Sequence, residues 1–253
     1  MEKTKEYIEN IKLYEESGID EQYNENPYNF LITNQTIFKK NIENKTENKT
    51  ENISIIKAKE EAKKLANETN NINELQEKIK NFTLNPLSKF ATNSITGTGT
   101  QTPTLLVITE MPNNDEDRSG IPLSGETGEL LKKILSAINC SIETNTFTFP
   151  ASPLRPAGSR APTKEEMEIS KPFIKRFIEL LKPKLILTMG SIPTQILLEK
   201  EDSITSVRGK FFEYQSIPLM ATFSLNYLLN NKEAKRKTWE DLQLLIPKIE
   251  EVK

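Results

Sequence analysis

The side chains that could take part in chemistry gather in three loops, residues 110–125, 150–160 and 224–231. Two of these loops follow apolar runs, TLLVIT (104–109) and PLMATF (218–223), which have the profile of buried strands. In a parallel sheet, ligands bind at the loops that follow the carboxyl ends of the strands. We therefore expect carboxylates, guanidinium groups and hydroxyls from these loops to meet at one edge of a sheet.

Composition restricts the chemistry that such an edge can perform. The chain has no histidine and a single cysteine, Cys140. Ser-His-Asp triads, His-ligated metals, internal disulfides and sites built from several thiolates are therefore excluded. Asp115, Glu116 and Asp117 could hold a metal ion, but such a run is usually a solvated loop, and we expect no metal site.

The elements that must position these loops alternate along the chain. A second buried strand is predicted at KLILTMG (184–190), and Thr163 with Glu166 forms a capping box at a helix start. Further helices are predicted at 125–139, 162–184, 192–198 and 233–251. This alternation predicts a three-layer α/β/α fold with a central, mostly parallel four-stranded sheet.

Residues 1–80 are predicted to be a helical extension that precedes a domain at 81–253. Within the extension, an Asn-rich stretch at 41–54 with a tandem ENKT repeat reads as a disordered linker. A helical pattern at 55–81 has this expected buried set: Ala58, Ala62, Leu65, Ala66, Ile72, Leu75 and Ile79. The start of the sequence has no apolar core like that of a signal peptide, and no apolar run is long enough to cross a bilayer. We expect a cytoplasmic protein without a membrane contact.

Charge divides unevenly over a chain whose net charge is −2. Residues 1–150 hold 17 basic and 23 acidic side chains, whereas residues 151–253 hold 17 basic and 13 acidic ones. The positive half could face an anionic partner such as a nucleic-acid backbone, or its lysines could simply solvate outer helix faces. Charge alone favours the second interpretation.

Four separated motifs together resemble the family 4 uracil-DNA glycosylases. The first, ITEMPNNDEDRSGIPLSGETGELLKKIL (108–135), is similar to the GEAPG, G-x-P-F-V-G and G-x-LL block of that family. RPAGSRAPTKEEMEISKPF (155–173), RGKFFEY (208–214) and TFSLNYLLNNKEAKRKTWEDL (222–242) are similar to its later blocks, in the same order. The resemblance runs from about residue 80 to 245. It implies base-excision repair, in which a damaged base is flipped out and its N-glycosidic bond is hydrolysed.

The resemblance also assigns site residues. It places Glu110 at the first-motif glutamate, which would stabilise the cationic sugar or orient water, and Ser224 at the histidine that donates to the leaving base. The substrate-binding positions fall at Thr109, Leu123, Pro150 and Asn226, with Leu123 replacing the stacking phenylalanine and Pro150 the asparagine that reads uracil. Tyr227, beside them, is expected to lie in the core.

Phosphate contacts are implied for four cations near the cleft, which are Arg155, Arg160, Arg208 and Lys210. The family's four cluster cysteines map to Phe82, Asn85, Leu154 and Ser170. None of these can ligate iron, so we expect no iron–sulfur cluster.

Three hypotheses about function follow. The chain is an N-glycosidase acting on uracil or another deaminated base, a catalytically inactive relative that binds DNA, or a protein-interaction module. The expected partner is uracil-containing or single-stranded DNA, bound by a monomer. The scaffold residues match the family better than the pocket residues do, and this difference puts catalysis in question.

Overall fold

The structure is a computed structural model that describes residues 54–252. Its strands are β1 (Thr98–Gly99), β2 (Leu105–Thr109), β3 (Thr146–Pro150), β4 (Leu185–Met189), β5 (Phe211–Tyr214) and β6 (Ile217–Thr222). A helix over 54–68 opens the described part. It is followed by α3 (Ile72–Lys80), α4 (Asn114–Ser119), α5 (Gly125–Ala137), α6 (Lys164–Leu181), α7 (Ser191–Leu198), α8 (Ile204–Val207), α9 (Leu225–Asn230) and α10 (Lys232–Glu251). Two short 3-10 turns lie at Pro86–Lys89 and Ala157–Ser159.

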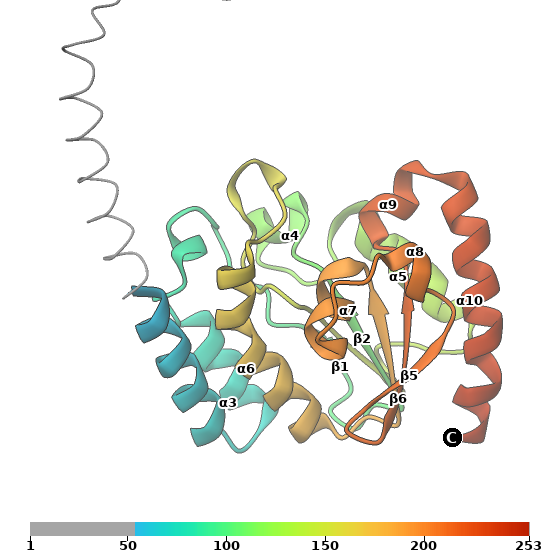
Figure 1. Cartoon of the computed structure of the whole chain (residues 1–253), viewed down its shortest axis with the longest axis horizontal. Helices are drawn as coiled ribbons and strands as arrows, with labels where there is room; N and C mark the ends of the chain where they lie inside the picture. Colours follow the sequence, from blue (N-terminus) through green and yellow to red (C-terminus); the bar gives the residue numbers. More distant parts are fainter. Residues whose placement is uncertain (1–53, 253) are drawn as a thin grey trace, which may run out of the picture. The chain divides into compact units, whose positions relative to one another are not determined.

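The six strands form one sheet in the order β1-β3-β2-β4-β6-β5. The four central strands are parallel, and β1 and β5 pair antiparallel at the two edges. Parallel strands end at the same edge, so β2, β4 and β6 deliver the residues that follow them to one place. That edge carries α4 and α9 in Figure 1.

Helices cover both faces of the sheet, because successive strand residues point to opposite faces and both sets are buried. On one face Leu106 and Ile108 of β2 pack in a cluster with the helix 54–68, α3, α6 and α7. On the other face Leu105 and Val107 pack with α5, α9 and α10. Figure 1 shows α3 and α6 on one side of the sheet and α10 on the other. Because both faces are covered, the central strands are buried at nearly every position and consist of apolar residues and threonines.

The expected three-layer α/β/α architecture is confirmed. The four parallel strands expected are present, and two short antiparallel edge strands extend the sheet to six. The capping box of α6 is also confirmed: the Thr163 side chain accepts from the Glu166 N–H, and the Glu166 side chain accepts from the Thr163 N–H. The helix α4 is an addition, because residues 110–125 were expected to be a loop.

The expected extension at 1–80 is described from residue 54 onward. The earlier part of the extension, with nearly all of the predicted linker at 41–54, lies outside the described residues. The pattern at 55–81 forms two helices, and its expected buried set packs toward α6 and the sheet. Among the described residues, no helix is long and apolar enough to cross a membrane.

Candidate active site

The candidate site lies where β2, β4 and β6 end. Glu110 directly follows β2, Gly190 follows β4 and Ser224 comes two residues after β6. Glu110 reaches across the end of β4, and its Oε1 accepts a hydrogen bond from the Ser191 N–H at 3.0 Å. This places a carboxylate at the first turn of α7, where free N–H groups and the helix dipole favour negative charge.

Gly190 makes this reach possible. It has a φ of +114°, and a Cβ added there would lie 2.3 Å from Oε1 of Glu110. Both the backbone conformation and the space therefore require glycine at this position. The GS sequence that ends the β4 motif is thus part of the site, although no sequence argument assigned it a role.

Glu110 and Ser224, the two expected catalytic residues, line the same small pocket. Burial raises the pKa of the Glu110 carboxyl, and hydrogen bonds from the Ile192 and Ser191 N–H groups and from the Ser224 hydroxyl oppose that rise. Ser224 also caps α9, where its side chain accepts from the Tyr227 N–H. The site therefore pairs a partly desolvated carboxylate with a hydroxyl on the opposite strand end.

A rigid brace holds the loop between β2 and α5. Asn113 and Glu116 form a reciprocal capping box at the start of α4. The other oxygen of Glu116 accepts the Leu123 N–H at 2.8 Å, and the Asn113 amide donates to Ser124 O at 2.7 Å and to Thr127 Oγ1 at 2.6 Å. The N-x-x-E pattern at 113–116 is a signal that could have predicted this brace from the sequence.

Leu123 occupies a strained position at the tip of this loop. Its φ is +61°, a conformation that costs a side-chain-bearing residue about 1 kcal/mol or more. Gly128 of α5 fits against its carbonyl so closely that a Cβ there would lie 1.9 Å from Leu123 O. The side chain is 7% exposed and belongs to the core cluster under α5. It therefore gives the site an aliphatic wall in place of an aromatic platform.

These residues enclose one small pocket. Five of the six expected catalytic and substrate-binding residues line it, and they are Thr109, Glu110, Leu123, Ser224 and Asn226. Asn113, Glu116 and Thr127 line it too and were not expected. Its volume is about 30 Å³. That is room for a few water molecules at most, so a base enters only if the walls move apart.

Pro150 and Tyr227 differ from the other expected residues. Pro150 ends β3 opposite Thr109 but lines a separate small void in the core, beside Phe149. The expectation that Tyr227 is a core residue is wrong: it is 49% exposed, and its ring lies 5.2 Å from that of Phe223. Tyr227 sits in the first turn of α9, whose buried face is taken by Leu225 and Leu228.

Two of the four expected phosphate-binding cations are held by carboxylates. Arg208 is 17% exposed, binds Asp241 at 2.7 Å and lies over the Phe223 ring at 5.3 Å. Arg160 binds Glu166 through both terminal nitrogens. Both cations therefore have a structural partner, so only part of their charge is available to a ligand.

Within residues 54–252, the other two cations bind only neutral oxygens. Arg155 donates to Pro112 O at 2.9 Å and to Ser159 Oγ at 2.6 Å, and so links the loops that follow β2 and β3. Lys210 is exposed and donates to Ser206 O at 2.8 Å. Their charge is not neutralised by a bound carboxylate, so these two keep the most capacity for a phosphate.

The four positions that match the family's cluster ligands are filled by ordinary packing. The Phe82 ring meets Phe173 edge-on at 5.5 Å, and Asn85 caps a 3-10 turn. Leu154 and Ser170 are buried. These side chains supply no thiolate, and Cys140 packs on the opposite face of the sheet in the cluster under α5. The residues present therefore do not fit an iron–sulfur cluster.

Comparison with known proteins agrees with this geometry. A model of the uracil-DNA glycosylase superfamily matches residues 96–243, which is more than half of the chain and includes every strand, so the chain belongs to that superfamily. Within it, the chain is 30% identical to a type-4 uracil-DNA glycosylase of Thermotoga maritima over 173 residues, or 67% of this chain and 90% of that protein. The resemblance to family 4 is thereby confirmed.

Two further relatives show how widely this domain occurs. A type-4 uracil-DNA glycosylase of Pyrobaculum aerophilum is 28% identical over 160 residues, covering 62% of this chain and 81% of that protein. A DNA polymerase of Bacillus phage SP01 is 24% identical over 167 residues, covering 66% of this chain and 18% of the polymerase. The similarity to the polymerase is therefore confined to a small part of that larger protein.

The close packing of Gly190 against Glu110 can be tested with a double-mutant cycle. We expect Gly190→Ala to lower the free energy of unfolding by about 1–3 kcal/mol, since it combines a strained backbone with a clash. In a Glu110→Ala background the clash disappears and the loss becomes smaller, as measured by urea unfolding. Gly158→Ala, at a left-handed φ of +65° with open space around it, shows the loss that a milder backbone strain causes without a clash. An equal loss in both backgrounds would contradict the packing described here.

The raised pKa of Glu110 predicts a pH dependence of stability. A carboxyl whose folded pKa exceeds its ordinary value of 4.5 stabilises the fold below that value, and this contribution is lost as the pH rises through the folded pKa. Glu110→Gln removes the titration. Between about pH 4 and pH 7 the unfolding free energy of the wild type should therefore fall relative to that of Glu110→Gln. A difference that stays constant over this range would show that burial does not raise this pKa.

Proposed function

We propose that this protein hydrolyses the N-glycosidic bond of uracil, or of another deaminated base, in DNA. The observation that carries the proposal is that Glu110 and Ser224 line one pocket at the carboxyl edge of the sheet. The names of the type-4 relatives support the uracil chemistry. The expected substrate is a uracil-containing or single-stranded DNA bound by a monomer, in base-excision repair inside the cytoplasm.

The residues divide the reaction between them. DNA binding flips the damaged nucleotide out, and the base enters between Leu123 and Asn226 as the pocket opens. The bond from the sugar to the base breaks, and its electron pair leaves with the base, to which the Ser224 hydroxyl donates a hydrogen bond. The Glu110 carboxylate faces the cationic sugar and orients the water that adds to it. The proton lost from that water passes to Glu110 or solvent.

The substitutions in the pocket predict a slow enzyme. Stacking on an aromatic ring is worth about 1–3 kcal/mol per base, and Leu123 supplies no ring. One missing oxyanion-type donor costs about 100- to 1,000-fold in rate. Here a Ser224 hydroxyl, in place of an imidazole, would donate the hydrogen bond to the leaving base. Pro150 lies outside the pocket and has no N–H, so it cannot read the base edge.

A second candidate function is DNA binding without catalysis. The observation in its favour is that the Glu110 carboxylate already accepts hydrogen bonds from the N-terminus of α7 and from Ser224. A carboxylate whose oxygens are occupied in this way has less capacity for a substrate. Arg155 and Lys210 would serve such a protein equally well as phosphate contacts.

A single-turnover assay tests these alternatives. The protein, in excess, is incubated with a single-stranded oligonucleotide that carries one uracil, and alkali then cleaves the strand wherever a base has been removed. We expect slow cleavage that Glu110→Gln reduces by about 100-fold or more and that Ser224→His accelerates. Because a contaminating glycosylase would cleave equally in both preparations, the Glu110→Gln protein is the control.

The other results of this assay are equally informative. Binding of the oligonucleotide without cleavage would establish the second candidate function in place of the first. Absence of both binding and cleavage would remove both candidates and leave a protein-interaction module.

We also propose that apolar packing replaces the family's iron–sulfur cluster in this chain. The edge-on contact between Phe82 and Phe173 and the buried Leu154 stand at or beside the ligand positions. We expect protein purified without oxygen to contain no stoichiometric iron, and a chelator to leave its melting temperature unchanged. An iron content that corresponds to one cluster per chain, or a melting temperature that a chelator lowers strongly, would show the proposal to be wrong.

A further inference from the structure

A groove outside the candidate active site runs between the helix 54–68 and α6. It has a volume of about 400 Å³. The helix that forms one of its walls lies outside the residues that the superfamily model matches, so the family resemblance assigns the groove no role. Five lysine or arginine side chains and three glutamates line it.

Ion pairs leave a positive excess in this groove. Lys59 binds Glu168 at 3.0 Å and Arg176 binds Glu179 at 2.8 Å, so two of the carboxylates are already neutralised. Lys171 is shared between Glu168 and Glu199. Among the described residues, neither Lys63 nor Lys175 has a carboxylate oxygen within 4.0 Å of its ammonium group. Glu60, the third glutamate of the groove, has no ion pair among the described residues, and Glu199 faces Lys171 from outside it. Five cations and these four carboxylates leave one net positive charge, with Lys63 and Lys175 the two lysines that bind no carboxylate.

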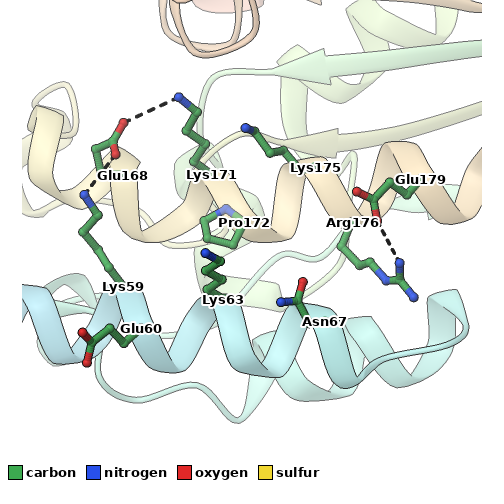
Figure 2. A pocket seen from close by; sticks show the side chains of 10 residues that line it. All are labelled: Lys59, Glu60, Lys63, Asn67, Glu168, Lys171, Pro172, Lys175, Arg176 and Glu179. Carbon is green, nitrogen blue, oxygen red and sulfur yellow. Dashed lines mark hydrogen bonds and ion pairs between the residues drawn. The ribbon is translucent and has the colours of Figure 1, made fainter. Parts of the chain in front are cut away.

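The two walls present their lysines at similar spacing. Lys59 and Lys63 are four residues apart on one helix, and Lys171 and Lys175 are four apart on the other. Four residues of an α-helix rise about 6 Å, which is comparable to the separation of successive phosphates along a nucleic-acid strand. Figure 2 shows Lys63 reaching from its helix toward Pro172 of α6, whereas the side chains of Lys171 and Lys175 extend from α6 to the side away from the helix 54–68.

The chemistry of the walls favours a polyanion over a peptide. A helical peptide that docks in a groove needs pockets for apolar anchors. Pro172 is the single apolar residue among those that line this groove. Lysine ammonium groups on flexible stems suit phosphate oxygens, which they contact as point charges without reading sequence.

The place of α6 in the fold connects this groove to the active site. The helix begins at Lys164, after the loop that carries Arg155 and Arg160, at the carboxyl edge of the sheet. It then runs back along the sheet. Lys171 and Lys175 follow Glu168 on this helix by about one and two turns. A strand that leaves the pocket over this loop passes the glutamates at the start of α6 and then reaches the lysines of the groove. Glu166 and Glu168 are already paired there, with Arg160 and Lys59.

We propose that the groove between the helix 54–68 and α6 binds the phosphate backbone of a single nucleic-acid strand and extends the DNA path beyond the active site. This inference rests on the proposed function, because it assumes that the site itself receives DNA. The groove adds affinity for long substrates and leaves the chemistry at Glu110 unchanged.

The test uses the full chain and two uracil-containing single strands, one of about 6 and one of about 20 nucleotides. Lys63→Gln/Lys175→Gln is compared with Lys57→Gln/Lys184→Gln, which removes the same charge at exposed lysines outside the groove. Affinity is measured by fluorescence anisotropy over a range of salt concentrations. We expect the groove variant to bind the long strand roughly tenfold more weakly at low salt, with a salt slope smaller by about 1.4 for two lost contacts. Its affinity for the short strand should match that of the control.

Two results would overturn the inference in distinguishable ways. If the wild type binds both strands and the two double variants behave alike on the long one, the groove has no part in binding and the proposed function stands. If the wild type binds neither strand, the proposed function fails together with the inference. Equal melting temperatures of the two variants exclude misfolding as the cause of any difference.

Discussion

The carboxylate of Glu110 at the start of α7 is the interaction on which the carboxyl edge of the sheet depends. It joins the end of β2 to the first turn after β4, and through Ser224 it reaches the end of β6. One side chain therefore fixes three strand ends relative to each other. Its desolvation is offset in part by backbone N–H groups that would otherwise be free at the helix start, and the balance still raises its pKa. Gly190 has no side chain, and the Glu110 carboxylate occupies the space that a Cβ at that position would need.

Substitution has affected the two kinds of residue in this fold differently. Gly128 and Gly190 are required by the packing, because a Cβ at either position would overlap Leu123 O or the Glu110 side chain. Leu123 and Ser224, which the resemblance assigns to ligand-contacting positions, contact the protein's own groups in this structure. Leu123 belongs to the core under α5, and Ser224 caps α9. A side chain that loses its ligand contact is still kept if it satisfies a buried group or fills a gap.

Sequence reasoning predicted the layers and most helices because they rest on periodic apolar patterns. The buried strands at 104–109, 184–190 and 218–223 were recognisable as apolar runs, and the α6 capping box by its spacing. The fourth strand of the expected sheet, β3, was counted but not located, because threonines alternate with phenylalanines in it. The edge strands β1 and β5 were missed because they are short and only partly buried, so they leave no apolar run. Five pocket residues followed from the motifs. The roles of Arg160 and Arg208 did not, because their carboxylate partners, Glu166 and Asp241, are identified only by the folded chain.

The two edge strands have a consequence for how this molecule behaves at high concentration. An open sheet edge is a template on which a second chain can add a strand. Here one edge is a two-residue strand, and the other is a four-residue strand that carries Glu213 and returns through Gln215 and Ser216, both at positive φ. A neighbouring chain finds only a few backbone groups in register before the edge turns away or meets charge. The parallel centre of the sheet, which is the more apolar part, is thereby kept from edge-to-edge aggregation.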